Sequence, residues 1–275
     1  GAMNLNSASG GAGAFSQIGL GGFNADGVHT GSTTATAGGA IVLTGGAAND
    51  TYAQIGAGGA GSDGNKVAAG VSVRGTSVSM TSGAGLGAYT QIGSGGGATG
   101  VGALPTGNAT GGVDVVTTVG GIALAGGADR AYSQIGQGGG GRNGDFTGEI
   151  QIVSADGLGL TGGSAARGYA LIGHGGTADA GGLTTGLRQG NVLASVAGLT
   201  QLIDGGSTAF LGHRGASGVT GSSRLALVTG QLNTAANATG VSGMIGNVIA
   251  AGSVEIGVTD GDLILNGSAL NYNSA

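Results

Sequence analysis

The sequence is short of several residue types that soluble proteins use freely. It contains no cysteine, no tryptophan and one proline (Pro105), and charged residues make up 8% of its 275 positions, against about 25% in an average soluble protein. The absence of cysteine excludes disulfides and thiolate metal sites. Because proline is nearly absent and no Gly-X-Y triplet persists, the 70 glycines do not form a collagen helix.

Charge and hydropathy argue against two classes of partner. The formal net charge is −5, and the seven arginines and the single lysine are scattered along the chain. No basic patch for nucleic acid or for an anionic membrane is therefore expected. No run approaches the roughly 20 apolar residues that span a bilayer. We predict no nucleic-acid partner and no membrane insertion.

What the sequence has instead is a repeat. Residues 52–59 read Tyr-Ala-Gln-Ile-Gly-Ala-Gly-Gly, and close copies of this signature occupy residues 15–22, 89–96, 132–139 and 169–176, with weaker copies at 210–215 and 244–247. Successive copies begin 37, 37, 43, 37 and 41 residues apart, counted at Phe15, Tyr52, Tyr89, Tyr132, Tyr169 and Phe210. A period of this size is typical of an array of stacked units.

Short alternating segments precede each signature. In the unit from residue 112 to 139, residues 113–116 and 122–125 alternate between aliphatic and small or polar side chains. Alternation favours strands and argues against a flexible Gly/Ser linker, the alternative that fits the glycine content alone. We predict an all-β parallel β-helix (β-solenoid) with three short strands per coil, about 37–43 residues per repeat, and a long protruding loop after each signature strand.

The chain reads as one domain. Gly1, Ala2 and Met3 are interpreted as a cloning remnant, and residues 4–275 as a single solenoid fragment cut from a longer array. The strands predicted to start at Val192, Leu225 and Val254 lie 33 and 29 residues apart. A less regular coil path is therefore expected after about residue 190.

Aliphatic side chains at alternate positions are predicted to fill the core. Stacking would align one such side chain from each coil at about 4.8 Å per step. The predicted column contains Leu43, Met80, Leu124 and Leu160.

The orientation of the signature strand stays open. An inward isoleucine is favoured, because this position is apolar in every copy: Ile18, Ile55, Ile92, Ile135 and Ile172. Two residues further on, the side chain varies freely (Leu20, Ala57, Ser94, Gln137, His174), which indicates an outward site of the same parity. A bend at Gly56 would remove the conflict.

In either orientation the signature forms ladders from coil to coil. We predict stacked tyrosine rings and glutamine side chains whose amides pair with one another; a ligand-binding stripe is the alternative. The ladder residues are Tyr52, Tyr89, Tyr132 and Tyr169, with Gln17, Gln54, Gln91 and Gln134.

Residues that could carry chemistry are dispersed. Asp114, Glu149 and Asp156 come closest to an acidic group, with Gln151 at the position equivalent to Asp114 in the next unit, and no lysine lies beside them. Glycosidases and lyases need clustered carboxylates or an adjacent base. We predict no enzymatic activity and no cofactor.

Metal sites are weakly indicated. Residues 58–64 and 138–145 resemble single calcium-binding Gly-Gly-x-Gly-x-Asp segments, with Asp63 and Asp145 as ligands, but that site needs tandem nine-residue repeats. His174 and His213 share a repeat position, which would stack them, while a specific metal site needs a third or fourth ligand. We predict no metal.

The segment at residues 121–127, together with the recurrent Tyr-x-Gln-Ile-Gly-x-Gly-Gly signature, resembles the repetitive regions of filamentous-haemagglutinin-like exoproteins, which Gram-negative bacteria secrete by two-partner or autotransporter routes. The resemblance covers residues 4 to about 215. It implies a right-handed β-helical shaft of a secreted or cell-surface adhesin, without catalytic residues. Its partners would be adjoining repeats, a glycan or protein of a host or neighbouring cell, or a second copy bound end to end. The alternative is a β-helix that binds or cleaves carbohydrate through its loops.

Overall fold

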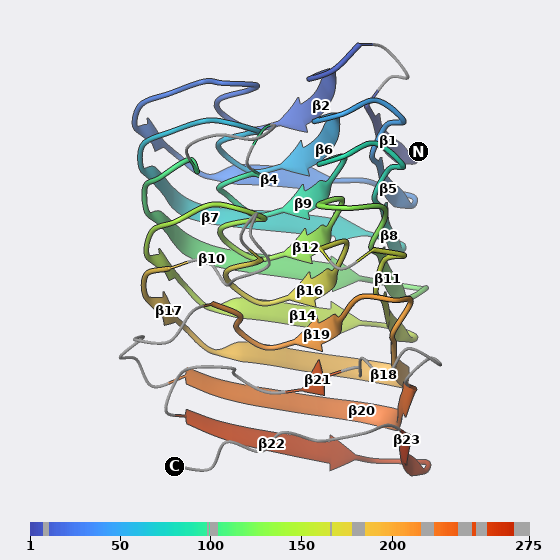
Figure 1. Ribbon diagram of the computed structural model, residues 1–275. Helices are drawn as coiled ribbons and strands as arrows, with labels where there is room; N and C mark the ends of the chain where they lie inside the picture. Colours follow the sequence, from blue (N-terminus) through green and yellow to red (C-terminus); the bar gives the residue numbers. More distant parts are fainter. Residues whose placement is uncertain are drawn as a thin grey trace.

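The computed structural model describes residues 1–7, 11–97, 99, 104–165, 167–177, 185–215, 223–235, 244–245 and 252–266. Within these residues every regular element is a β-strand, and every strand pairing is parallel. The strands lie one above another in a tall stack with the N-terminus at one end and the C-terminus at the other (Figure 1). The predicted all-β, parallel architecture is confirmed.

Two sheets make up the stack. The larger has sixteen strands among the described residues: β1 (Met3–Asn6), β3 (His29–Thr30), β4 (Thr33–Thr36), β5 (Ile41–Thr44), β7 (Lys66–Gly75), β8 (Val78–Thr81), β10 (Ala109–Thr117), β11 (Ile122–Ala125), β13 (Phe146–Thr147), β14 (Ile150–Ser154), β15 (Leu158–Thr161), β17 (Arg188–Gln189), β18 (Val192–Ile203), β20 (Ser223–Ala235), β22 (Gly252–Val258) and β23 (Leu263–Asn266).

The smaller sheet contains the signature strands. They are β2 (Phe15–Ile18), β6 (Tyr52–Ile55), β9 (Thr90–Ile92), β12 (Ser133–Ile135), β16 (Ala170–Ile172), β19 (Ala209–Leu211) and β21 (Met244–Ile245), in that order along the sheet. Each signature strand therefore pairs with the copies one repeat before and one repeat after it, which is the arrangement that the period predicts.

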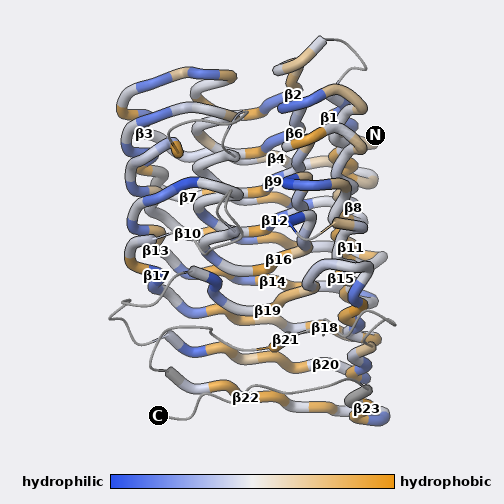
Figure 2. The backbone as a smooth tube through the Cα atoms, in the orientation of Figure 1, coloured by the Kyte–Doolittle hydropathy of each residue, from blue (hydrophilic) through white to orange (hydrophobic). Residues whose placement is uncertain are grey.

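The aliphatic core lies between the two sheets. The predicted column is confirmed: Leu43 pairs with Met80, Met80 with Leu124, and Leu124 with Leu160, and all four are buried. Along the long strands buried aliphatic residues alternate with more polar, outward ones (Figure 2). Each buried aliphatic side chain stabilises the fold by about 1.5–3 kcal/mol, and the column repeats this contribution in every unit.

The segment after the signature does not protrude where the structure describes it. Gly58, Ala60 and Ser62 are buried, and the amides of Gly59 and Gly61 donate to the carbonyls of Gly95 and Gly97 one repeat later. This part of the predicted loop is thus another layer of the stack, because its backbone continues the hydrogen-bond ladder. Residues 98, 100–103 and 178–184 of the predicted loops lie outside the described residues.

The later units have longer strands. β18 pairs with β14 up to Val196 and with β15 from Thr200. The register shift between Val196 and Leu199 in its pairing with β20 therefore lies at the gap between β14 and β15. Val192, Leu225 and Val254, the expected strand starts after residue 190, lie in register with one another. Two segments that meet at a corner in the earlier units thus become one continuous strand.

Candidate functional site

The aromatic side chains of the signature form one continuous column. The ring centroids of Phe15, Tyr52, Tyr89, Tyr132 and Tyr169 are 4.8–5.1 Å apart, with planes within 8° of parallel. The four tyrosines are buried in an apolar cluster separate from the main core. Because burial disfavours the phenolate, the pKa values of Tyr89 and Tyr132 are raised well above the ordinary value. These rings pack and do not titrate near neutral pH.

Each tyrosine hydroxyl has a dedicated acceptor one repeat earlier. The hydroxyls of Tyr52, Tyr89, Tyr132 and Tyr169 donate to Oε1 of Gln17, Gln54, Gln91 and Gln134 at 3.3, 3.0, 3.2 and 3.4 Å. A buried hydroxyl needs such a partner. The hydroxyl column therefore holds each repeat to the one before it.

The predicted pairing between glutamine amides is wrong. Gln134 Nε2 donates to the backbone carbonyls of Gln137, Gly173 and Gly175 at 3.2, 3.0 and 3.0 Å. The amide nitrogen thus binds the glycine bend of the next repeat while the amide oxygen binds tyrosine. Both halves of the amide are occupied, so none is left to pair with another glutamine.

The signature strand is buried on both faces, which resolves its orientation. Ile55 packs in the aliphatic core, and Tyr52 and Gln54 lie on the opposite, also buried, side. Beyond it, Gly56 has φ 141° and a Cβ there would lie 2.1 Å from the carbonyl oxygen of Gly93. Only glycine permits both this backbone and this approach.

The freely varying position after the bend faces inward, so the predicted outward site is wrong from the second copy onward. Ala57, Ser94, Gln137 and His174 are buried, and only Leu20, in the first copy, is exposed. Ile55 and Ala57 are both buried, as alternation requires of residues two apart, so it was the free variation at this position that misled the prediction.

These inward side chains bridge the interior. Ser94 Oγ accepts the amide N–H of Ala57 at 3.2 Å, Gln137 Oε1 that of Ser94 at 2.6 Å, and His174 Nδ1 that of Gln137 at 3.0 Å. On its far side Gln137 Nε2 donates to the Gly111 carbonyl at 2.8 Å. Through Gly111 the column thus ties the signature sheet to β10 of the larger sheet.

His174 and His213 stack, as their shared repeat position predicts. Their ring centroids are 4.7 Å apart, and all four ring nitrogens have protein partners. A metal ion would have to displace those partners. His29, the third histidine, lies in β3, where it pairs with Lys66.

Sequence reasoning missed three buried cations. Lys66, Arg142 and Arg188 are fully buried. Arg142 donates to the backbone carbonyls of Gly64, Thr106 and Gly107 at 2.6, 3.1 and 3.3 Å, and also to that of Ser62. Burial lowers the pKa of Arg142 to about 10, so it stays charged at neutral pH.

Arg188 and Lys66 also donate their hydrogen bonds to backbone carbonyls. The Arg188 guanidinium lies 4.1 Å over the Phe146 ring and donates to the carbonyls of Gly144 and Thr185. Lys66 Nζ donates to the carbonyls of Gly27 and Asp63 at 3.0 and 2.7 Å. The register of β13 and β17 places Phe146 against Arg188, but no signal in the sequence marks these cations as buried.

Asp63 and Asp145, the candidate calcium ligands, lie two repeats apart along the stack and bind backbone groups. Asp63 Oδ1 accepts the amide N–H of Thr106 at 2.6 Å, and Asp145 Oδ1 that of Leu187 at 2.8 Å. Each carboxylate thus bonds to the next repeat. In the part of the chain that the structure describes, no group of three or more His, Cys, Asp or Glu residues is placed to hold a metal ion.

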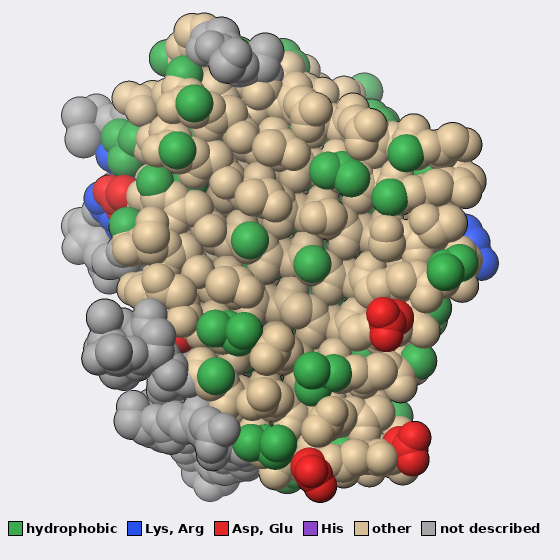
Figure 3. Space-filling model, turned by 90° about the vertical axis from the view of Figure 1, so that its right-hand side faces the viewer, with side chains coloured by type: hydrophobic (Ala, Val, Ile, Leu, Met, Phe, Trp, Pro, Cys, Tyr) green, Lys and Arg blue, Asp and Glu red, His purple; other side chains and the backbone are tan. Residues whose placement is uncertain are grey.

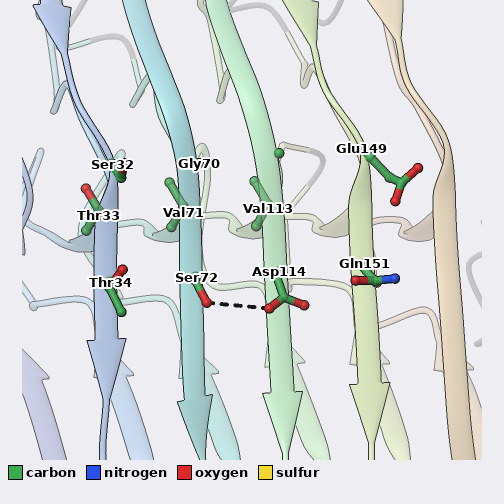
Figure 4. A pocket seen from close by; sticks show the side chains of 11 residues that line it. Ser32, Thr33, Thr34, Gly70, Val71, Ser72, Val113, Asp114, Glu149 and Gln151 are labelled. Carbon is green, nitrogen blue, oxygen red and sulfur yellow. Dashed lines mark hydrogen bonds between the residues drawn. The ribbon is translucent and has the colours of Figure 1, made fainter.

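A shallow groove of about 300 Å³ crosses β4, β7, β10 and β14. Gly70 and Gly112 pair with each other and form the floor of the groove because glycine has no side chain, and Ser32 and Glu149 flank them. Thr34, Ser72, Asp114 and Gln151 lie in a row along one side (Figure 4), and Ser72 Oγ donates to Asp114 Oδ2 at 3.4 Å.

The structure brings Asp114, Glu149 and Gln151 together at this groove, as the repeat positions predict. Asp156 lies elsewhere, after the end of β14, where it faces Gly198. The lining contains no lysine, arginine or histidine. Two carboxylates with hydroxyl and amide neighbours can accept and donate hydrogen bonds to a polyol, but they have no basic partner there.

The face that carries β5, β8, β11 and β15 shows scattered hydrophobic side chains, with a few acidic ones in its lower part and a few charged ones at its margins, and without a gathered apolar patch (Figure 3). None of the described residues forms a helix long and apolar enough to cross a membrane. Comparison of the chain with models of known protein families, with curated proteins and with solved structures finds no match.

Proposed function

We propose that this chain is a structural shaft segment of a large secreted or cell-surface adhesin of the filamentous-haemagglutinin-like kind from a Gram-negative bacterium, with no catalytic activity. Its coils are right-handed, with three strands each. The signature repeat and the parallel stack support this proposal.

The observation that carries it is the direction of the polar bonds. Tyrosine hydroxyls, glutamine amides and loop carboxylates bond to the adjacent repeat. Side chains engaged in this way hold neighbouring repeats in register along the axis, which suits a spacer that must keep its length under load.

Binding and turnover assays test this function. The purified protein is screened against a panel of glycans and against intact cells, with β-elimination and reducing-end assays for cleavage. A shaft segment shows neither saturable binding nor turnover, and a far-UV circular dichroism melt is unchanged by chelator. Saturable binding or turnover would overturn the proposal.

Carbohydrate binding is the second candidate, and the groove over β7 and β10 favours it. Its hydroxyl, amide and carboxylate groups lie on a rigid sheet, where they could bond sugar hydroxyls. If the screen finds a glycan, D114N combined with E149Q should abolish its binding, while D156N, outside the groove, should not.

End-to-end association is part of the same proposal. In the isolated segment β1 pairs with β5 and β22 with β20 among the described strands, and a strand edge that lacks a partner templates further strands. Sedimentation at increasing protein concentration tests this. A strict monomer at high concentration contradicts it.

A further inference from the structure

Two histidines lie at one joint of the stack, between β16 and β19. His174 Nδ1 accepts the amide N–H of Gln137 at 3.0 Å, and His213 Nδ1 accepts that of His174 at 3.1 Å. Each Nε2 bonds the carbonyl of a glycine across the interior, His174 to Gly148 and His213 to Gly190, both at 2.7 Å. Since a carbonyl only accepts, each Nε2 must carry the hydrogen and each Nδ1 must be bare. Both rings are therefore in the neutral Nε2–H form.

One repeat before His174, the equivalent position makes the same two hydrogen bonds with a side chain that does not titrate. Gln137 accepts the amide N–H of Ser94 through Oε1 and donates to the Gly111 carbonyl through Nε2. An amide thus supplies both bonds that each histidine supplies. The stack changes from a side chain that cannot gain a proton to two that can.

We propose that His174 and His213 form an acid-labile joint, at which protonation separates the signature strands of the later units from those of the earlier ones. A proton on Nδ1 turns an acceptor into a donor that faces the amide N–H of the preceding repeat. Both bonds along the column, to Gln137 and to His174, would then be lost. Charging both rings would also place two cations in a stack with centroids 4.7 Å apart.

Among the described residues, the charged groups that act on the two rings are cationic. Arg188 of β17 is the charged side chain that acts on both rings, and its positive charge opposes theirs. Arg214, which follows His213 in the same bend, is a further cation, and its guanidinium lies 5.7 Å from the centroid of the Tyr169 ring. The hydrogen-bond partners of the two rings are backbone groups of Gln137, His174, Gly148 and Gly190. Burial, with the charge of Arg188, lowers the pKa of His213 to about 4 and that of His174 well below its ordinary value.

The pH window follows from these directions. An opened joint exposes histidines that titrate near pH 6.5, whereas in the closed joint the pKa of His213 is lowered to about 4 and that of His174 lies well below its ordinary value. Closure is therefore fully favoured above pH 6.5 and is progressively lost between 6.5 and about 4. At pH 5 the equilibrium constant for opening should increase about 30-fold through His213 alone, and further if His174 is also protonated on opening.

The larger sheet should keep its pairing while the joint opens. β18 pairs with β14, β15 and β20 along most of its length, whereas β19 is a three-residue strand next to the histidines. The signature side thus opens locally, without separation of the whole stack.

Hydrogen exchange of the whole protein tests the joint. Amide exchange in residues 209–213 is followed at pH 7, 6, 5 and 4, corrected for the intrinsic pH dependence, in the wild type and in H174Q/H213Q. We expect protection to fall below pH 6.5 in the wild type and to stay level in the glutamine variant. Equal pH profiles for the two proteins would overturn the proposal.

A second measurement does not depend on the variant. Carbon-13 spectra of the wild-type histidine rings should show two of the three rings neutral until protection is lost, and then charged together with it. If all three rings titrate near pH 6.5 while residues 209–213 stay protected, the joint is not acid-labile. Residues 52–55 provide an internal region whose exchange should not change, because the position equivalent to His174 is Ala57 in their own repeat and Ser94 in the next.

Discussion

The earlier and later repeats hold their stacks together by different means. From β6 to β16 the signature strands are short, and stacked tyrosines, glutamine bridges and buried cations join one repeat to the next. In the later repeats β18 and β20 of the larger sheet run continuously over 12 and 13 residues. The tyrosine column ends where this change begins.

The pairing between tyrosine and glutamine explains where the ladder stops. Ala170 pairs with Ala209, so the residue opposite Tyr169 is Thr208, which cannot stack a ring. In the repeat of Tyr169 the glutamine position is filled by Leu171, which cannot accept a hydrogen bond, and the next repeat has no tyrosine hydroxyl that would need one. Acceptor and donor disappear together, because either alone would leave a buried polar group unsatisfied.

Disrupting a glycine bend should have the largest effect on the earlier repeats. In Gly93→Ala the new Cβ would lie 2.0 Å from the backbone carbonyl oxygen of Gly136, at a φ of 141°. We expect a loss of about 4 kcal/mol or more in the free energy of unfolding, measured by urea denaturation. Gly159→Ala, where nothing lies within 4 Å, is the control and should be nearly neutral. Equal stability of the two variants would contradict the role of the bend.

Removal of a buried cation should come next. Arg142→Met leaves the carbonyls of Gly64, Thr106 and Gly107 without a donor, and we expect a loss of about 3–4 kcal/mol. Arg74→Met, on the exposed side of β7, removes the same charge at the surface. If both substitutions change the denaturation midpoint equally, the carbonyl bonds of Arg142 do not stabilise the stack.

Acid should destabilise the junction between the two regions by a comparable amount. The pKa of His213 is lowered by burial to about 4. Between about pH 6.5 and pH 4, His213 therefore binds a proton in the unfolded chain but not in the folded chain. The stability is complete above pH 6.5 and falls until about pH 4, by about 3 kcal/mol for this residue. Denaturant midpoints at pH 7 and pH 4.5 measure it. The drop in H213Q should be smaller, and an identical drop would refute the assignment to His213.

The smallest effect should come from one hydroxyl of the ladder. Tyr89→Phe leaves Oε1 of Gln54 without its donor, at a cost of about 1–2 kcal/mol. Adding Gln54→Leu reproduces the Leu171 end of the natural ladder, so the double variant should lose less than the sum of the single losses. Phe15→Tyr, in the first copy, should be nearly neutral. Strict additivity would show that the pair does not act as a unit.

The parallel stack and its aliphatic columns could be predicted from the sequence, because alternation and period are local and repeated. Leu43, Met80, Leu124 and Leu160 lie where the alternation places them. The alignment of Phe210 with the tyrosines was wrong, since register places it against Leu171. At this worn copy the isoleucine position, filled by Leu211, was the better guide.

The site could be predicted only in part. Free variation at Ser94, Gln137 and His174 normally indicates exposure, but here each side chain accepts the amide N–H of the preceding repeat, and Gln137 and His174 also bond a glycine carbonyl across the interior. Arg142 was missed for a related reason: its partners are backbone carbonyls, and no carboxylate in the sequence marks their position.

The hydroxyl ladder limits how the number of repeats can change in evolution. Each tyrosine requires a glutamine in the unit before it, and each glutamine requires a tyrosine in the unit after it. A unit that carries both can be duplicated or deleted whole, and its neighbours still match. A recombination point inside a unit would leave a tyrosine without its glutamine, or a glutamine without its tyrosine. Length can therefore change by recombination at the unit boundary without any compensating substitution.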